Sequence, residues 1–288
     1  MYLVAKTRMN EQEAFQLFER MIKVAEEQLV SFTKNSNINV EKKADKSVVT
    51  ECDQTIDRAL TNIAHEQGLK VVSEEGEHVL DIVKSGSYMT IDPIDGTLGY
   101  IEYVNDALDN DGIHSFGTKD LGAASDFCLL LGIVENNSPK FGILYNYITK
   151  EKIFVSAEGK LIRENNVRNY DAKHCFYMDQ RMGGELEAQV HDMEGVTSVV
   201  QAAFGLKSMY TIINPHKNAV TIHRVQSAGL WDVMPAAVAA KAFGAKIFDD
   251  LGQELEFDKY IVLPGKGASV IKGKLFDFVP QKLKEIPN

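Results

Sequence analysis

The chain has 288 residues and a formal net charge of -10, and 44% of its residues are hydrophobic. That composition is typical of a globular protein with a large core, and the length suits one large domain or two lobes. A uniformly acidic chain repels nucleic acid and anionic membranes, so we expect neither as a partner. If the substrate is also anionic, cations must mediate its binding, and metal ions are the natural choice.

The cysteines and the N-terminus bear on the cellular compartment. The three cysteines lie far apart and form no CxxC pair, so neither a disulfide framework nor a structural zinc site is expected. The first ten residues lack the apolar stretch of a signal peptide, and the longest apolar run, near residues 127–134, is too short to cross a bilayer. We therefore expect a soluble, cytoplasmic protein.

Helices come first in the predicted order of elements. Apolar residues recur at helical spacing over 10–30, and Asn10 with Glu13 can form a capping box at the start of that helix. A polar, loop-like stretch follows, and a second helix is expected to end at Gly68. This second helix is expected over 53–67. Two buried strands that run into acidic residues follow, over 70–73 and 88–91.

Strands dominate the middle of the chain and alternate with helices beyond residue 163. The stretch 100–122 is rich in Asp and Gly and predicts a long irregular loop. Three apolar segments separated by turns then predict an antiparallel meander, over 127–134, 141–147 and 152–156. Later strands are expected at 174–178, 219–225, 246–249, 254–257 and 268–272, with helices at 184–193 and 231–243, while 197–210 is ambiguous. This change of pattern predicts two lobes, 1–165 and 166–288.

The most informative segment is TIDPIDGT, residues 90–97, in which an apolar strand ends in two acids. A proline fixes the backbone between Asp92 and Asp95, so both carboxylates and the Ile94 carbonyl can point at one place. Such hard oxygen donors suit Mg²⁺. If a helix begins after Gly96, its free N–H groups face the same place and can bind phosphate. Turn chemistry alone would explain DPxD, but the complete motif after a strand is more specific.

Three further acids are candidates for the same site. Glu74 follows a strand, and adjacent parallel strands would bring it beside the DPIDGT corner, although an isolated Glu pair is usually a solvated turn. Asp53 lies where a helix begins, and capping that helix is compatible with a role at the site. Asp232 enters a strongly apolar helix, where a favourable interaction with the helix dipole is the alternative explanation.

Four segments occur in the order and approximate spacing of one known family: KADKSVVTECD, VVSEE, IDPIDGT and LWDVMPAAVAAKAFGA. Over about residues 42–257 the chain therefore resembles the inositol monophosphatase superfamily, which includes inositol monophosphatases, 3′(2′),5′-bisphosphate nucleotidases and fructose-1,6-bisphosphatases. DPIDGT with a downstream WD is highly specific, and the other segments strengthen the match. The resemblance implies an α+β fold, a layered αβαβα sandwich with the metal ions between the lobes.

The resemblance also implies a Mg²⁺-dependent phosphomonoesterase with two or three ions per site. One ion would activate water for attack on phosphorus, and another would neutralise the leaving alkoxide. The implied metal ligands are Glu74, Asp92, the Ile94 carbonyl, Asp95 and Asp232. The implied catalytic residues, which orient and deprotonate the water, are Asp53 and Thr97 together with Glu74. The implied phosphate-binding N–H groups are those of Gly96, Thr97 and Leu98. Relatives are commonly homodimers inhibited by lithium, so we expect both properties.

Departures from the family leave the substrate open. The stretch 98–125 is longer than in inositol monophosphatases, and the residues before WD lack the acid that contacts inositol in those enzymes. Arg224 there suits either a second anionic group or a solvated strand end. SEE with KADKS is slightly closer to the bisphosphate nucleotidases. We therefore expect a small phosphorylated metabolite, either an inositol monophosphate or a 3′(2′),5′-bisphosphate nucleotide. A sugar bisphosphatase or histidinol-phosphatase-like enzyme is an alternative.

Two rival interpretations are weaker. Haloacid dehalogenase phosphatases also carry a DxDGT motif, but they need an aspartate nucleophile where this chain has Pro93. A metal-binding scaffold without turnover would be favoured if one acidic ligand or Thr97 were replaced, and all are present. The scaffold therefore stays a minor alternative.

Overall fold

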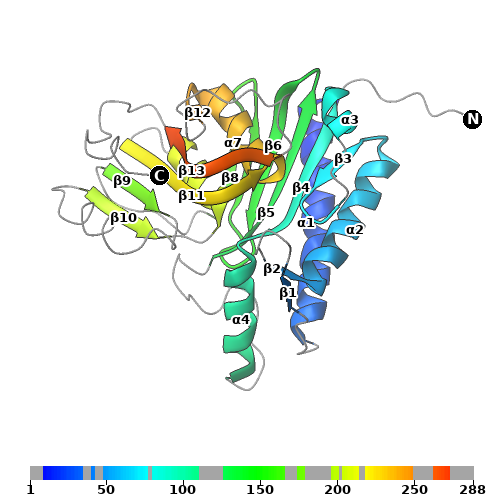
Figure 1. Ribbon diagram of the computed structural model, residues 1–288. Helices are drawn as coiled ribbons and strands as arrows, with labels where there is room; N and C mark the ends of the chain where they lie inside the picture. The colour runs from blue at the N-terminus through cyan, green and yellow to red at the C-terminus, as the bar shows by residue number, and fades with distance from the viewer. Residues whose placement is uncertain are drawn as a thin grey trace, which may run out of the picture.

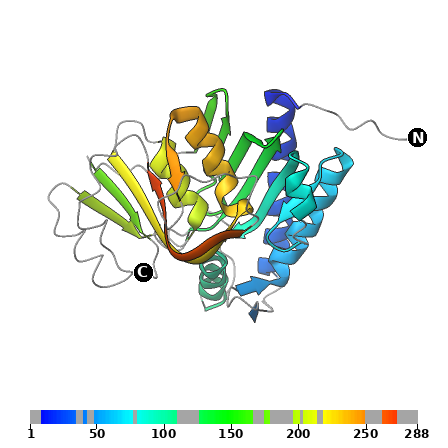
Figure 2. The ribbon, with the colours of Figure 1, turned by 45° about the horizontal axis from the view of Figure 1, so that its top comes forward.

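The computed structural model describes residues 9–34, 40–42, 48–76, 80–109, 126–165, 174–178, 196–200, 203–213, 218–248 and 262–272. Its elements form successive layers of helices, sheet, helices and a second sheet (Figures 1 and 2). Among the described residues, no helix combines the length and the apolar character needed to cross a membrane.

The first sheet has six strands in the order β3-β4-β5-β6-β7-β8. Its first pair is parallel and the other neighbours are antiparallel, so the predicted meander and the predicted parallel pair are both confirmed. The strands are β3 (Val71–Ser73), β4 (Tyr88–Asp95), β5 (Cys128–Glu135), β6 (Ser138–Asn146), β7 (Lys152–Ser156) and β8 (Leu161–Glu164). Both faces are apolar, because side chains alternate between the faces along each strand. On β5, for example, Leu129 and Leu130 belong to different core clusters.

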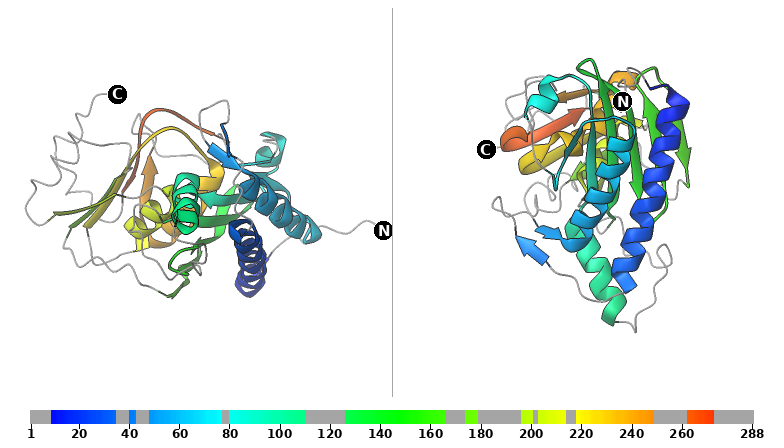
Figure 3. Two further views of the ribbon diagram at one scale, coloured as in Figure 1. Left: turned by 90° about the horizontal axis from the view of Figure 1, so that it is seen from below. Right: turned by 90° about the vertical axis from the view of Figure 1, so that its right-hand side faces the viewer.

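Helices α1 (Glu11–Lys34) and α2 (Glu51–Glu66) cover one face of this sheet (Figure 3). The predicted capping box of α1 is confirmed: Asn10 and Glu13 exchange backbone-to-side-chain hydrogen bonds of 3.1 and 2.9 Å. The N-cap of α2 is Thr50, so Asp53 is the third residue of the helix. Two short strands, β1 (Val40–Lys42) and β2 (Val48–Thr50), pair before α2, and the short helix α3 (Leu80–Lys84) precedes β4.

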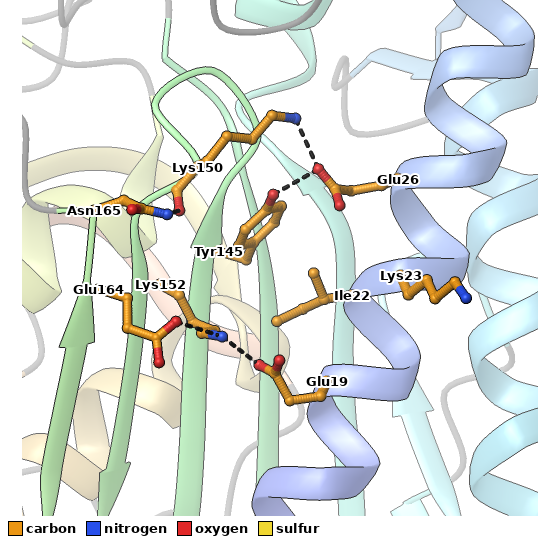
Figure 4. A pocket seen from close by; sticks show the side chains of 9 residues that line it. All are labelled: Glu19, Ile22, Lys23, Glu26, Tyr145, Lys150, Lys152, Glu164 and Asn165. Atoms are coloured by element: carbon orange, nitrogen blue, oxygen red, sulfur yellow. Dashed lines mark hydrogen bonds and ion pairs between the residues drawn. The ribbon is translucent and has the colours of Figure 1, made fainter.

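Ion pairs hold α1 to the far edge of the sheet, around a pocket between them (Figure 4). The ammonium of Lys152 lies 2.6 Å from Glu19 and 2.8 Å from Glu164. Burial lowers the pKa of Lys152, but these two carboxylates outweigh that effect and the net pKa is raised. The Glu26 carboxylate similarly binds the side chains of Tyr145 and Lys150. Five of the charged side chains in the pocket wall therefore pair with one another.

Helices α6 (Phe204–Ile213) and α7 (Leu230–Phe243) pack on the other face of the first sheet. The apolar sequence of α7 suits this middle layer, and Gly244 ends the helix in the left-handed conformation, as expected. The helix approaches β6 closely, because a Cβ added at Gly142 would lie 2.8 Å from the Cα of Pro235. This packing fixes the height of α7 over the sheet.

The second sheet has five strands in the order β10-β9-β11-β13-β12. They are β9 (His174–Met178), β10 (Val196–Val200), β11 (Asn218–Gly229), β12 (Lys246–Phe248) and β13 (Val262–Lys272). The ambiguous segment 197–210 divides between β10 and α6. The predicted helix at 184–193 and strand at 254–257 lie outside the described residues. The first sheet ends at Glu164 and the second begins at His174, while the division into lobes 1–165 and 166–288 stays a prediction.

One expectation was wrong. The polar stretch after DPIDGT begins not as an irregular loop but as α4 (Thr97–Asp109), which projects from the body of the molecule (Figure 1). Its first turns bury Tyr100, Tyr103 and Val104, whose spacing of three and four is helical. The abundant Asp and Gly residues outweighed that short apolar stripe in the prediction. The remainder of the predicted loop, 110–125, lies outside the described residues.

Candidate active site

The corner between β4 and α4 positions the first two acids. Three steps along β4, from Asp92 to Asp95, oppose two steps along β5, so the strand bulges at this point. Asp92 is 1% and Asp95 6% exposed. The Asp92 carboxylate accepts a hydrogen bond of 3.1 Å from the N–H of Ile94, which tightens the turn around the proline. The bulge and the proline together orient both acids toward one place.

Helix α7 brings the third acid to this corner. Asp232 is the third residue of the helix, and its carboxylate accepts a hydrogen bond of 2.5 Å from the N–H of Gly229. Carboxylate oxygens of Asp92, Asp95 and Asp232 all lie within 4.8 Å of one another. We call these three residues the acidic cluster. The fold has therefore joined residues that are 140 positions apart in the sequence (Asp92 to Asp232).

Glu74 lies beside the acidic cluster because β3 and β4 are parallel. Its N–H donates a hydrogen bond of 3.1 Å to the carbonyl of Ile91 and so continues the ladder between these strands. The charge of Glu74 raises the pKa values of Asp92, Asp232 and Asp53, as expected of a carboxylate at the end of the neighbouring strand. The structure thus brings all the predicted acidic residues together.

Burial raises the pKa values of the three acids in the cluster, and neighbouring negative charges add to the effect for Asp92 and Asp232. Burial and then the charges of Glu74, Asp95 and Asp232 raise the pKa of Asp92 well above its usual range. Burial, followed by the charges of Glu74 and Asp95, does the same for Asp232. Burial also raises the pKa of Asp95 to about 6, against the lowering effect of hydrogen bonds from Gly205 and Phe204. The buried carboxylates are therefore stabilised either by binding protons or by binding cations.

Asp53 and Thr97 meet at one edge of the acidic cluster. The Thr97 hydroxyl lies 3.3 Å from Oδ1 of Asp53 and 3.2 Å from the carbonyl oxygen of Ile94, and can donate to either. The other oxygen of Asp53 accepts hydrogen bonds from the N–H and the hydroxyl of Thr50. Burial raises the pKa of Asp53 to about 6, although the bonds from Thr50 lower it. A buried carboxylate next to a hydroxyl is suited to accepting a proton.

The start of α4 supplies the predicted phosphate-binding backbone. Gly96 has a φ of 93°, a left-handed conformation that favours glycine, and it turns the chain from β4 into the helix. Thr97 and Leu98 open α4, where N–H groups have no carbonyl of a preceding turn to bond. Leu98 is 46% exposed, so this corner is open to solvent.

Sequence reasoning missed the contribution of α6. The N–H groups of Phe204 and Gly205, at the start of α6, donate hydrogen bonds of 2.9 and 2.5 Å to the two oxygens of Asp95. The thiol of Cys128 lies 3.5 Å from the same carboxylate. The glycine of FGLKS, residues 204–208, was the available signal in the sequence, because a glycine lets another part of the chain approach the start of a helix closely.

Sequence reasoning also missed a tyrosine that supports the corner between β4 and α4. The hydroxyl of Tyr147, fully buried on the helix-covered side of the sheet, donates a hydrogen bond of 2.9 Å to the carbonyl of Pro93. It therefore holds the peptide between the two acids. The side chain of Arg224, by contrast, lies outside the described residues, so its predicted alternatives stay open.

The acidic cluster is chemically suited to divalent metal ions. Its donors are carboxylate oxygens, the preferred ligands of Mg²⁺. Oδ2 of Asp92 is buried and accepts no hydrogen bond from any described residue. A buried acceptor without a partner costs free energy that a bound cation would recover. Fold and site together define a class of protein. Its members have layered sheets and helices, and an acid-lined site suited to metal ions lies at a strand-to-helix corner.

Comparison with known proteins identifies the family within this class. Residues 9–275 match the model of the inositol monophosphatase family. The chain is 27% identical, over 199 residues, to a fructose-1,6-bisphosphatase/inositol-1-monophosphatase of Methanocaldococcus jannaschii, covering 66% of this chain and 67% of the relative. The chain thus belongs to the inositol monophosphatase family, a family of phosphatases.

Solved structures share the fold. An IMPase/NADP phosphatase complexed with Mg²⁺ and phosphate superposes with a TM-score of 0.66 at 15% identity, covering 91% of each chain. A staphylococcal inositol monophosphatase-1, in a LiCl-soaked inhibitory complex, gives 0.68 at 15% identity, covering 93% of this chain and 92% of that one. CysQ from Bacteroides thetaiotaomicron gives 0.61 at 17% identity over 86% and 92%. The expected αβαβα fold of the inositol monophosphatase type is confirmed.

Proposed function

We propose that this phosphatase is a Mg²⁺-dependent phosphomonoesterase that hydrolyses a small phosphorylated metabolite by means of an activated water. The observation that carries the proposal is the acidic cluster, whose carboxylates lie within 4.8 Å of one another beside the Asp53–Thr97 pair. The proposed Mg²⁺ ligands are Glu74, Asp92, the Ile94 carbonyl, Asp95 and Asp232. Two or three bound ions would supply an activated water and neutralise charge on the phosphate ester.

Each residue of the site then has its own role in the proposed reaction. Asp53 accepts the proton of the attacking water, and the Thr97 hydroxyl, within hydrogen-bonding range of Asp53, orients that water, with Glu74 beside both. The N–H groups of Gly96, Thr97 and Leu98 bind phosphate oxygens at the positive end of the α4 dipole. The raised pKa of Asp53, about 6, keeps it ionised and basic near neutral pH.

For the substrate we propose an inositol monophosphate or a 3′(2′),5′-bisphosphate nucleotide. The relative from Methanocaldococcus jannaschii is named a fructose-1,6-bisphosphatase/inositol-1-monophosphatase, and a structural neighbour is described as bound to D-inositol-1-phosphate. Another neighbour is complexed with NADP and Ca²⁺. These are small soluble phosphate esters, and a sugar bisphosphate is the second candidate because of the curated relative.

Three further properties are proposed from the family and its relatives: a homodimer, inhibition by lithium and a cytoplasmic location. A neighbour's LiCl-soaked inhibitory complex supports the second of these. Light scattering tests the first, and titration of phosphatase activity with LiCl tests the second.

The primary experiment measures phosphate release from p-nitrophenyl phosphate with Mg²⁺ and with EDTA, followed by a screen of inositol phosphates, adenosine 3′,5′-bisphosphate, fructose 1,6-bisphosphate and histidinol phosphate. We expect Asp95→Asn to reduce turnover by more than about a hundredfold while the fold persists, since a metal ligand contributes several kcal/mol to the reaction. Glu158→Gln is the control, because that surface carboxylate pairs only with Lys140 among the described residues. Near-normal turnover in Asp95→Asn would contradict the assignment.

A further inference from the structure

One peptide group of the DPIDGT corner is held at both ends by hydrogen bonds. The hydroxyl of Tyr147 donates a hydrogen bond of 2.9 Å to the carbonyl oxygen of Pro93. The N–H of the same peptide group belongs to Ile94, and it donates a hydrogen bond of 3.1 Å to Oδ1 of Asp92. A peptide group is planar, so fixing its carbonyl oxygen also fixes the direction of its N–H. The tyrosine is therefore linked to the Asp92 carboxylate through a single rigid unit.

The bulge in β4 explains why this peptide group uses a side chain as its partner. The register with β5 skips the two residues between Asp92 and Asp95, so the 93–94 peptide lies within the bulge and outside the regular ladder. Both of its residues are buried, and a buried backbone group that makes no hydrogen bond costs free energy. The Tyr147 hydroxyl therefore satisfies a carbonyl that the bulge takes out of the ladder.

Packing holds the tyrosine itself in place. Tyr147 follows β6 directly and is fully buried. Its N–H donates a hydrogen bond of 3.1 Å to the carbonyl of Phe127. Its ring centre lies 5.5 Å from that of Phe127 and 5.7 Å from that of Tyr145. Contacts with two other rings in a close-packed core leave this ring little freedom to turn, so its hydroxyl stays directed at the Pro93 carbonyl.

We propose that Tyr147 is a positioning residue of the metal site, which fixes the Asp92 carboxylate so that Oδ2 stays available to a cation. Oδ1 is occupied by the N–H of Ile94, whereas Oδ2 is buried and accepts no hydrogen bond from any described residue. The hydroxyl also strengthens that N–H as a donor, because linked hydrogen bonds polarise one another. A carboxylate that is already oriented loses less conformational freedom when a cation binds. This role rests on the proposed function only in assuming that the acidic cluster binds divalent cations.

The test compares Mn²⁺ binding by the full-length wild type and by Tyr147→Phe, which keeps the ring and removes the hydroxyl. Electron paramagnetic resonance of free Mn²⁺ gives the dissociation constants. We expect Tyr147→Phe to bind Mn²⁺ at least about tenfold more weakly, the usual effect of removing a group that orients a metal ligand. In the metal-free variant, the amide-proton resonance of Ile94 should move upfield, because its hydrogen bond to Asp92 weakens.

Two controls separate the hydroxyl from the packing of the ring. Tyr145→Phe removes the hydroxyl of the neighbouring tyrosine, which donates to Glu26 on α1 (Figure 4), and should leave Mn²⁺ binding and the Ile94 resonance unchanged. Incorporation of 4-aminophenylalanine at position 147 keeps a hydrogen-bond donor in the same place and should restore much of the lost affinity. If Tyr147→Phe does not fold without metal, 4-fluorophenylalanine at position 147, which fills the space of the hydroxyl without donating a hydrogen bond, replaces it in every comparison.

Unchanged or tighter Mn²⁺ binding in a natively folded variant without the hydroxyl overturns the proposal, even if the wild type is an active phosphatase. A loss of affinity that Tyr145→Phe shows to the same extent also overturns it, since general loosening of the core would then be the cause. A wild type that binds no divalent cation contradicts the proposed function instead. In that case an upfield shift of the Ile94 amide confined to Tyr147→Phe supports the link to Asp92, and an unchanged resonance overturns it.

Discussion

At the scale of single residues, the site depends on pairs whose members come from different elements. Asp53 belongs to α2 and Thr97 to α4, yet their side-chain oxygens lie 3.3 Å apart. The Thr97 hydroxyl has a second acceptor within range, the Ile94 carbonyl at 3.2 Å. This arrangement fixes the hydroxyl at the edge of the acidic cluster without making it a metal ligand of the proposed site. Removing the hydroxyl should therefore affect the proposed chemistry more than metal binding.

Thr97→Val tests this separation. Valine has the shape of threonine without the hydroxyl, so we expect kcat to fall about a hundredfold, in the range typical of positioned proton-transfer groups, with little change in Mg²⁺ affinity. Thr97→Ser should retain most of the activity. Thr90→Val is a matched control on β4, since the buried hydroxyl of Thr90 has no hydrogen-bond partner among the described residues. Weakened Mg²⁺ binding with unchanged kcat in Thr97→Val would refute the assigned role.

At the scale of elements, a buried polar cluster fixes α6 against the first sheet. Glu151, fully buried before β7, accepts hydrogen bonds from the hydroxyl of Tyr210 on α6 and, at 2.6 Å, from Arg163 on β8. The Arg163 guanidinium also lies 5.6 Å from the centre of the Tyr210 ring. Because the start of α6 holds Asp95, the position of this helix bears directly on the acidic cluster.

Removal of one hydroxyl from this cluster should destabilise the fold. In Tyr210→Phe the buried Glu151 carboxylate loses one hydrogen bond, and we expect the free energy of unfolding to fall by about 1–3 kcal/mol. Tyr145→Phe is the matched control, because the Tyr145 hydroxyl binds the partly exposed Glu26, which water can also solvate. Urea denaturation measures both. An equal or larger loss in Tyr145→Phe would show that burial of Glu151 is not the decisive factor.

At the scale of the whole molecule, the acidic cluster and Asp53 link stability to pH and metal. Burial is the first cause of the raised pKa values of Asp53, Asp92, Asp95 and Asp232, and two of these rise from 3.8 to about 6. Between these values the folded chain keeps protons that the unfolded chain has lost. The stability of the metal-free protein must therefore decrease as the pH rises through this window. Bound cations would replace the protons and prevent this decrease in stability.

Thermal unfolding with EDTA and with Mg²⁺ at several pH values checks this expectation. We expect Asp53 and Asp95 to lower metal-free stability between about pH 4 and pH 6, each by about 1.4 kcal/mol per unit of pKa difference, and Mg²⁺ to stabilise the protein most above about pH 6. Asp92→Asn removes one of the charges and should flatten the pH dependence while weakening metal binding. Metal-free wild-type stability that does not decline across this range, or an unaltered slope in Asp92→Asn, would argue against the predicted linkage.

The sequence by itself determined the features that depend on neighbouring residues. The capping box of Asn10 and Glu13, the apolar strands of the meander and the proline between Asp92 and Asp95 follow from local chemistry, and they predicted elements and candidate ligands alike. Composition led to the wrong prediction at one place, where the abundant Asp and Gly residues predicted a loop in the segment that forms α4. The family motifs also pointed to Asp232, although no local rule placed it beside residues so distant in the chain.

The tertiary structure decided what surrounds those ligands. The amides of Phe204 and Gly205 reach Asp95 across 109 and 110 positions, and Tyr210 on the same helix reaches Glu151. Hydrogen bonds and charges of this kind depend on how α6 packs between two sheets, and packing leaves no periodic or local signal in the sequence. The identities of the proposed ligands are therefore readable from the chain, whereas the electrostatic balance around them is set only when the layers come together.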